Sequence, residues 1–215
     1  MFLMAKFDYR TIEAQEYSHA DEPSVVILNE RNYITFKSKG HFDLQDAQFM
    51  QQVASMYALA DGIRQQAATS NKLAWFKDYV PYPLNSYWYE DGSYLLLIKQ
   101  PNFTIPELLD NAKAALVSKF PAALLDDIHF ERHAEGVEAQ LINHGPVVPD
   151  NATFKTLAKF MADNQFQRHF TGHREVYLTP LTPDLAPAKL EVLIRIPIER
   201  NESSLDSGRF PVAEN

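Results

Sequence analysis

The stretch Gly172-His173-Arg174-Glu175-Val176-Tyr177-Leu178-Thr179-Pro180 has the pattern of a β-strand, and the rest of the chain is interpreted outward from it. Side chains alternate between the two faces of a strand. This alternation places on one face His173, Glu175, Tyr177 and Thr179, and on the other Val176 and Leu178. Glutamate is depleted in strands and is seldom buried without a partner. Glu175 therefore needs an explanation: either a functional carboxylate, or an exposed one that pairs with Arg174 or Lys189. We expect Val176 and Leu178 to hold the sheet to its helix.

The composition fits one globular domain, or two small modules that share a core. The chain has 215 residues, of which 46% are hydrophobic and 12% aromatic, and its formal net charge is −8. An acidic chain without a cluster of Lys and Arg is not expected to bind nucleic acid. The absence of cysteine excludes disulfides and thiol catalysis and predicts a cytoplasmic protein. A signal peptide is not expected, and no apolar run reaches the roughly 18 residues of a membrane span.

Hydrophobic periodicity and turn residues predict alternating strands and helices. A long amphipathic helix is predicted over 44–68 with Asp43 as its N-cap, and a capping box at 104–107 begins a second helix that continues to Phe120. Asp150 is predicted to cap a third helix. Asp91-Gly92 predicts a tight turn, and Glu135-Gly136 the turn of a hairpin. The predicted strands are 25–28, 33–36, 73–80, 94–98, 128–132, 137–142, 172–180 and 190–198.

The same order of elements occurs twice. A strand that ends at Gly40 and one that ends at Gly145 are each followed by a helix and then by two strands. No residue-level repeat accompanies this order. The repeated order of elements by itself predicts a duplicated βαββ unit with a ligand cleft between its halves. We expect a leader over 1–24 that packs on the body, a single domain over 25–199 with halves of about 25–125 and 126–199, and a disordered tail over 200–215.

Six short segments, in order between residues 6 and 199, resemble the motifs of one bacterial family. Pro83-Leu84-Asn85-Ser86-Tyr87-Trp88 resembles Pro-Leu-Glu-Gly-Leu-Trp, and Ile98-Lys99-Gln100-Pro101-Asn102-Phe103 resembles Ile/Met-Arg-Gln-Pro-Asp-Phe. His144-Gly145-Pro146 resembles the segment before the family's second long helix, and His173-Arg174-Glu175-Val176-Tyr177-Leu178 resembles His-x-Glu-Ile-Tyr-Leu. Pro187-Ala188-Lys189-Leu190 with Arg195-Ile196-Pro197-Ile198 resembles Pro-x-Lys-Leu with Arg-x-Pro-Val. The chain thereby resembles the GyrI-like small-molecule-binding domain in its stand-alone form.

The resemblance implies an α+β fold of duplicated βαββ (SHS2-type) modules, with an antiparallel sheet, helices on one face and a central aromatic cleft. In relatives fused to MerR- or AraC-type DNA-binding domains, a buried glutamate among aromatic rings binds cationic, lipophilic drugs. Some stand-alone members are hydrolases of cyclopropane-containing compounds. This chain departs from the family at Asn85, where the family has glutamate, so a role that needs that acid is not carried over.

The predicted function is the binding of a small amphipathic or cationic organic molecule. A carboxylate attracts a cation, and the faces of aromatic rings add to that attraction. The predicted ligand-binding residues are Glu175, Tyr177, Trp88, Trp75, Tyr82 and Tyr33. No cofactor and no metal is expected, because the histidines lack the spacing of metal ligands, and His173 is expected to be a partly solvated edge residue. The small molecule is the expected partner, without nucleic acid or membrane, and the oligomeric state is left open.

Two other functions are consistent with the sequence. In the first, the protein is a hydrolase of cyclopropane-containing or other electrophilic small molecules, with Glu175 and Tyr177 as catalytic residues and Glu175 as the general base on water. In the second, the chain is a protein-interaction module of the gyrase-inhibitor type, which would need an exposed apolar patch.

Overall fold

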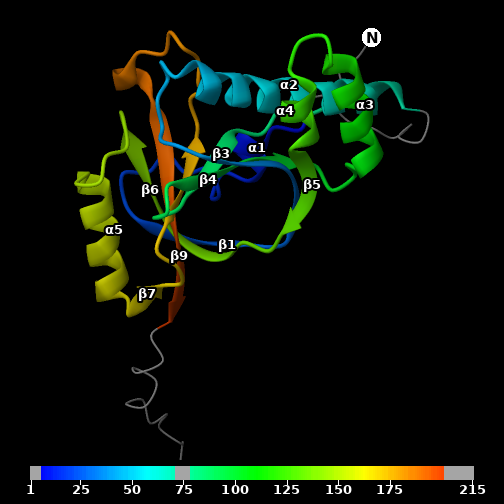
Figure 1. The fold of residues 1–215 in the computed structure, drawn as a ribbon. Coiled ribbons are helices and arrows are strands. Elements are labelled where there is room, and N and C mark those ends of the chain that lie inside the picture. The colour runs from blue at the N-terminus through cyan, green and yellow to red at the C-terminus, as the bar shows by residue number, and fades with distance from the viewer. Residues whose placement is uncertain (1–5, 71–77, 201–215) are drawn as a thin grey trace, which may run out of the picture.

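The computed structural model describes residues 6–70 and 78–200 (Figure 1). Residues 201–215 of the predicted tail and most of the predicted strand over 73–80, including Trp75, lie outside the described residues. The strands are β1 (Ser24–Leu28), β2 (Arg31–Lys39), β3 (Leu84–Trp88), β4 (Ser93–Gln100), β5 (Ile128–His133), β6 (Gly136–His144), β7 (Phe166–Arg168), β8 (His173–Tyr177) and β9 (Glu191–Arg200). The α-helices are α1 (Tyr9–Ile12), α2 (Ala47–Thr69), α3 (Pro106–Leu116), α4 (Ala122–Asp126) and α5 (Ala152–Asp163), and a 3-10 turn covers Pro187–Lys189.

The strands form one antiparallel sheet in the order β1-β6-β9-β8-β3-β4-β2-β5, and β7 pairs separately with β9. The first half is β2-α2-β3-β4, and the second is β6-α5-β8-β9 with the short strand β7 inserted between α5 and β8. The strands β3 and β8 lie at the centre of the sheet, where they pair with each other and Ser86 lies opposite Glu175. The predicted α+β fold of duplicated βαββ units is therefore confirmed.

The hairpin predicted around Glu135-Gly136 does not form. The strands β5 and β6 follow each other in the chain, yet β5 pairs with β2 and β6 pairs with β1. Only residues 29–30 separate β1 from β2, and only residues 134–135 separate β5 from β6. Each pair is thus one bent strand that passes from one half to the other. Because β1 and β2 lie near opposite ends of the strand order, the sheet must curl until its ends approach each other.

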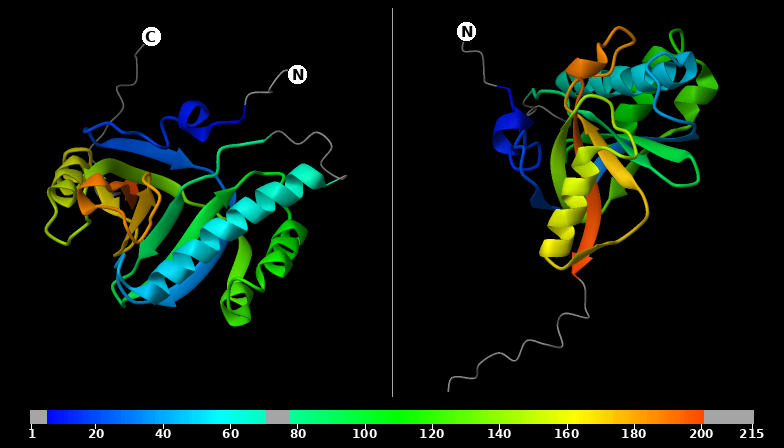
Figure 2. Two further views of the ribbon diagram at one scale, coloured as in Figure 1. Left: turned by 90° about the horizontal axis from the view of Figure 1, so that it is seen from above. Right: turned by 90° about the vertical axis from the view of Figure 1, so that its left-hand side faces the viewer.

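Both long helices lie on the same face of this sheet (Figure 2). Directly opposed residues of antiparallel strands share a face, so Glu175 shares its face with Ser86 and, through the next pair, with Leu96. That face is the one that α2 covers, because Phe49 of α2 contacts Tyr94 with ring centroids 5.9 Å apart. The helix α5 covers the same face in the second half. Thr153 near the start of α5 donates at 2.8 Å to Asn143 of β6, and Asn143 shares the face of Tyr177 through Val192.

The expectation that Val176 and Leu178 hold the sheet to its helix is wrong. The predicted alternation is correct, but the helices lie on the Glu175 face, and Val176 is fully buried on the opposite one. The strand also ends at Tyr177, before Leu178. The opposite face is buried because the sheet curls and because the N-terminal segment packs on it, where Glu13 pairs with Lys99 and the backbone oxygen of Glu16 accepts from Arg195. Alternation alone does not indicate which of two buried faces a helix covers.

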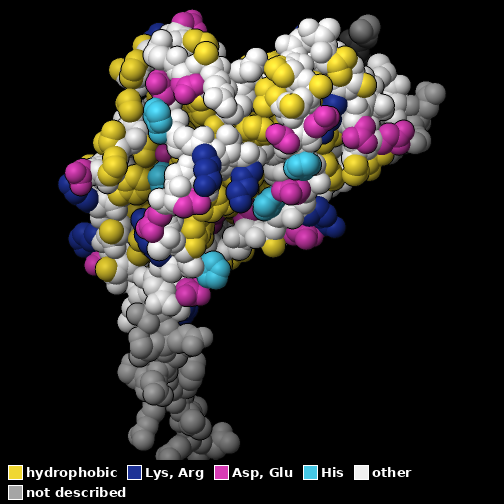
Figure 3. All heavy atoms as spheres, in the orientation of Figure 1, with side chains coloured by type: hydrophobic (Ala, Val, Ile, Leu, Met, Phe, Trp, Pro, Cys, Tyr) yellow, Lys and Arg dark blue, Asp and Glu magenta, His cyan; other side chains and the backbone are white. Residues whose placement is uncertain are grey.

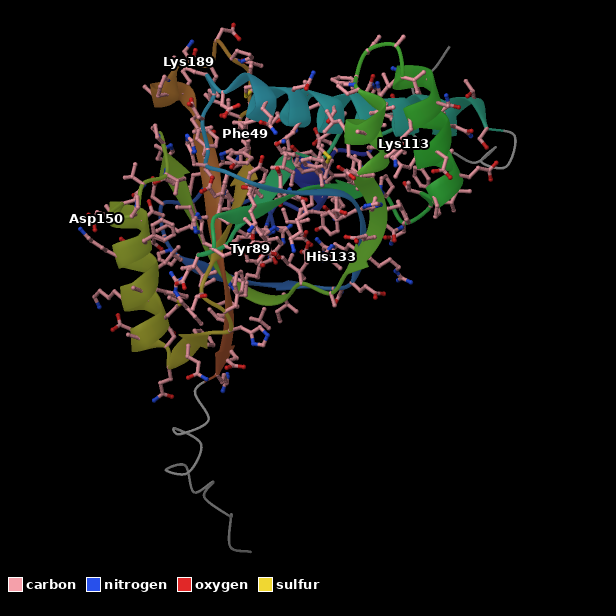
Figure 4. The ribbon with its side chains drawn as sticks, in the orientation of Figure 1. Phe49, Tyr89, Lys113, His133, Asp150 and Lys189 are labelled. Atoms are coloured by element: carbon pink, nitrogen blue, oxygen red, sulfur yellow. The ribbon has the colours of Figure 1, made fainter. Side chains whose placement is uncertain are left out.

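The helix starts differ from their predictions by a few residues. The side chain of Asp46, and not that of Asp43, caps α2 by accepting from the backbone N–H groups of Gln48 and Phe49. Asn151, and not Asp150, caps α5; Figure 4 labels Asp150 just before that helix. The predicted capping box does not form, because α3 begins at Pro106 after an N-cap at Ile105 that makes no side-chain hydrogen bond. The chain then turns after Leu116 and continues into the separate helix α4. The predicted turn at Asp91-Gly92 is confirmed, with Gly92 at φ +73°.

The face opposite the helices holds a buried cluster of charged groups. The guanidinium of Arg174 lies 3.0 Å from Glu135 and 3.5 Å from Glu138, and Arg195 lies 3.8 Å from Glu138. Burial acts against the charge of Arg174, but the Glu135 carboxylate keeps the pKa of this arginine well above its usual value. Burial also acts to raise the pKa of Glu135, yet Arg174 outweighs it and leaves that pKa below its usual value. The cluster ties β8 to the β5–β6 bend at the point where the sheet curls.

Candidate functional site

A hollow of about 620 Å³ opens on the helix face, between the two halves. The connection from β2 to α2 lines one side, and the connection from β6 to α5 with Phe154 lines the other. Its central residues are Trp88 at the end of β3 and His173 and Glu175 on β8. The end of β3 continues into Tyr89, which also lines the hollow and is labelled in Figure 4. We refer to this hollow as the cleft.

Glu175 lies at the centre of the sheet with 4% of its surface exposed. Its Oε1 atom lies 2.8 Å from Nε2 of His173, and its Oε2 atom accepts a hydrogen bond of 2.8 Å from the hydroxyl of Tyr177. Strand alternation brings these three side chains together, since they are two residues apart along β8. A buried carboxylate that lacked such partners would be strongly unfavourable, so the two neighbours allow it to remain there.

The Tyr177 hydroxyl connects Glu175 to β3. It lies 2.8 Å from Oγ of Ser86, and the indole Nε1 of Trp88 donates to it at 3.4 Å. Because its one hydrogen is directed at Glu175, the hydroxyl must accept from both Ser86 and Trp88. Burial, followed by the neighbouring carboxylate, holds the pKa of the Tyr177 phenol well above its usual value. This tyrosine is therefore a hydrogen-bond donor to Glu175 at neutral pH.

Aromatic rings surround this polar group. Phe42 stacks on Tyr177 with ring centroids 5.8 Å apart and an interplanar angle of 22°. Trp88 packs against Tyr94 at 5.0 Å and against Phe49, which extends from α2 and is labelled in Figure 4. From the other half, the ring of Phe154 meets His173 edge-on at 4.9 Å.

The cleft has a negative formal charge when its histidines are neutral. Glu90 and Glu175 line it together with one arginine, Arg168. Arg168 is already engaged, because its guanidinium donates to the backbone oxygen of Gly172 at 3.2 Å. A bound cation would thus be attracted both by charge and by the faces of the aromatic rings.

The sequence-predicted residues fall into four groups. Glu175 and Trp88 line the cleft, and the hydroxyl of the buried Tyr177 contacts both of them from beneath it. Tyr82 lies instead beside a second hollow of about 470 Å³, where the Lys99 ammonium lies 4.6 Å from the centroid of its ring. Tyr33 lies on the opposite face of the sheet, where its hydroxyl donates to Glu135. Trp75 lies outside the described residues.

Asn85, which stands where the GyrI-like motif that this segment resembles has glutamate, also points away from the cleft. Its Oδ1 atom accepts a hydrogen bond of 2.9 Å from Nε of Arg174, and its amide donates to the backbone of Pro83. The substitution therefore leaves the composition of the cleft unchanged and affects the buried cluster on the opposite face.

Sequence reasoning underestimated His173. It predicted a partly solvated edge histidine, and 22% of the side chain is indeed exposed, but it did not predict the contact with Glu175 or the position on the wall of the cleft. The signal was present in the sequence, because positions i and i+2 of a strand are neighbours on one face. In the described part of the chain, no three His, Cys, Asp or Glu side chains are grouped so that they could hold a metal ion. Of the helices in residues 6–70 and 78–200, none combines the length and the apolar character that a membrane crossing requires.

Several solved structures share this fold. A hydrolase from Listeria innocua aligns with a TM-score of 0.78 and 24% identity, over 90% of this chain and 100% of that one. An uncharacterized conserved protein from the same organism gives a TM-score of 0.77 at 24% identity, over the same shares of both chains. The C-terminal domain of EcmrR aligns with a TM-score of 0.52 and 11% identity, over 84% of this chain and 98% of that domain. At these identities the likeness is one of fold. No family model and no curated protein matches the chain.

Proposed function

We propose that the protein binds a small organic cation with an apolar body in the cleft, as a GyrI-like domain would. One observation carries the proposal: a buried carboxylate, Glu175, lies at the base of an open, aromatic-lined hollow. A carboxylate is expensive to keep in such surroundings unless it is paired. Its two hydrogen bonds satisfy the carboxylate oxygens but do not balance the negative charge of Glu175. A cationic ligand would neutralise that charge.

The walls of the cleft support an apolar ligand body. Phe42, Trp88 and Phe154 present rings from three different segments, and ligand pockets commonly combine such rings with a few polar groups. The volume of about 620 Å³ is within the range of small-molecule sites. Elsewhere on the surface, as Figure 3 shows for one face, Lys and Arg side chains are interspersed with acidic and histidine side chains. This mixture supports a small molecule, and not nucleic acid, as the partner.

A titration with a lipophilic cationic dye tests the proposal. We expect saturable binding to the wild type and roughly tenfold weaker binding to Glu175→Gln, because the loss of one nearby negative charge that contributes about 1.4 kcal/mol changes affinity tenfold. Glu131→Gln is the matched control, since it removes the same charge from β5, away from the cleft. Equal binding by all three proteins would overturn the proposal.

Hydrolysis is the second candidate function, and the contact of 2.8 Å between His173 and Glu175 favours it. A carboxylate paired with an imidazole can take a proton from a water molecule that attacks an electrophilic carbon. A panel of cyclopropane-bearing compounds, assayed with wild type and Glu175→Ala, tests this activity. Turnover by the wild type that is lost in the variant would support hydrolysis. The absence of turnover across the panel would rule out hydrolysis as the function.

A further inference from the structure

The hydrogen bonds of Glu175 limit what a ligand can contact directly. One oxygen faces His173 and the other accepts from Tyr177, and only 6% of the side chain is exposed. A ligand that contacted the carboxylate directly would have to displace one of these partners. His173 lies nearer the open space, since 22% of its side chain is exposed and its ring lines the cleft.

With Glu175 ionised and His173 neutral, the surrounding network fixes how the protons of His173 are arranged. Glu175 accepts the hydroxyl hydrogen of Tyr177, as an ionised carboxylate does. A carboxylate has no hydrogen to offer, so Nε2 of His173 must donate to it. A neutral imidazole carries one hydrogen, and with that hydrogen on Nε2 the Nδ1 atom is left with a lone pair.

The Nδ1 atom is available to a ligand. It has no hydrogen-bond partner within residues 6–70 and 78–200, and it is not one of the buried polar atoms that lack partners in that part of the chain. It is therefore accessible from the cleft that its ring lines. The ligand meets a hydrogen-bond acceptor, and the charge of Glu175 acts through the imidazole behind it.

We propose that the cleft selects protonated amines that carry an N–H hydrogen over quaternary cations, with Nδ1 of His173 accepting that hydrogen. This inference rests on the proposed binding function and specifies its ligand class. A quaternary ammonium has the same charge but no hydrogen to donate, so it would leave the Nδ1 lone pair desolvated and unpaired. A hydrogen bond to a charged donor is among the stronger ones in proteins.

A matched ligand pair tests this specificity. We would titrate the wild type by calorimetry at pH 8 with a naphthylalkyl dimethylamine that remains protonated there and with its trimethylammonium homologue. We expect the amine to bind about tenfold more tightly or better, from a charge-assisted hydrogen bond. The preference should fall to within about twofold in His173→Phe, which keeps a ring beside Phe154 and removes the acceptor.

A second measurement covers the case in which His173→Phe does not fold. In a long-range proton–nitrogen spectrum of the wild type, the amine should shift the Nδ1 resonance of His173, and the quaternary homologue should leave it near its free position. Equal affinities for the two ligands would overturn the inference while leaving the proposed function intact. If neither ligand bound, both the proposed binding function and the inferred preference for protonated amines would be overturned.

Discussion

The Tyr177 hydroxyl offers a quantitative test of the polar network beneath the cleft. Tyr177→Phe removes one oxygen atom that accepts from Ser86 and Trp88 and donates to Glu175. Ser86 is fully buried and Glu175 nearly so. Each buried group that loses its partner costs about 1–3 kcal/mol. Because the long indole contact of 3.4 Å contributes least, we expect the free energy of unfolding to fall by about 3 kcal/mol.

Urea denaturation measures this loss as a shift of the unfolding midpoint. Tyr57→Phe is the matched control, since its hydroxyl accepts a single backbone hydrogen bond, of 3.1 Å, from Leu181. That hydroxyl is also sheltered from water, and burial raises the pKa of Tyr57 to about 12. We expect the control to lose about 1 kcal/mol. If Tyr177→Phe lost no more than Tyr57→Phe, the network around the Tyr177 hydroxyl would be refuted.

Two further predictions concern stability. In the folded protein the pKa of Glu135 lies below its usual value of 4.5. Its contribution to stability is therefore complete above pH 4.5 and is lost as the pH falls from there through the folded pKa. Glu135→Gln should therefore cost about 3 kcal/mol at pH 7 and progressively less below about pH 4; a cost in urea unfolding that stayed constant to pH 3 would contradict this. Gly172→Ala should lower the free energy of unfolding by about 1–3 kcal/mol, because a Cβ atom there would lie 2.4 Å from the backbone oxygen of Trp88 and from the ring of Phe170. Wild-type stability of the Gly172→Ala variant in the same assay would show that β3 and the start of β8 are not in this close contact.

The local features of the fold were accessible from the sequence. Alternation along residues 173–177 correctly grouped His173, Glu175 and Tyr177 on one face. The repeated order of elements predicted the duplicated fold. Helix starts were displaced by a few residues because several Asp and Asn side chains near each start are competent caps, and only the backbone geometry selects one.

The failures concern contacts between residues far apart in the sequence. The 128–142 segment has the pattern of a hairpin, yet each of its strands pairs with β1 or β2, and local patterns do not encode that choice. Tyr33 and Tyr82 are aromatic residues on suitable segments, but the curl of the sheet and the N-terminal segment place them away from the cleft. Trp88 reaches the cleft because β3 pairs with β8 in the register that sets it opposite His173, and a shift of one residue would have turned it to the other face.

The indole N–H of Trp88 tests the central claim, that ligands bind in the cleft beside Glu175, most directly. Its signal in a proton–nitrogen spectrum can be assigned by its loss in Trp88→Phe, and it reports on an atom that contacts Tyr177. During a titration with a cationic dye, we predict that this signal shifts and saturates with the dissociation constant of the dye. In Glu175→Gln, the dye should bind more weakly and the Trp88 signal should saturate at correspondingly higher dye concentrations. A dye that bound tightly while the Trp88 signal stayed in place would contradict the claim.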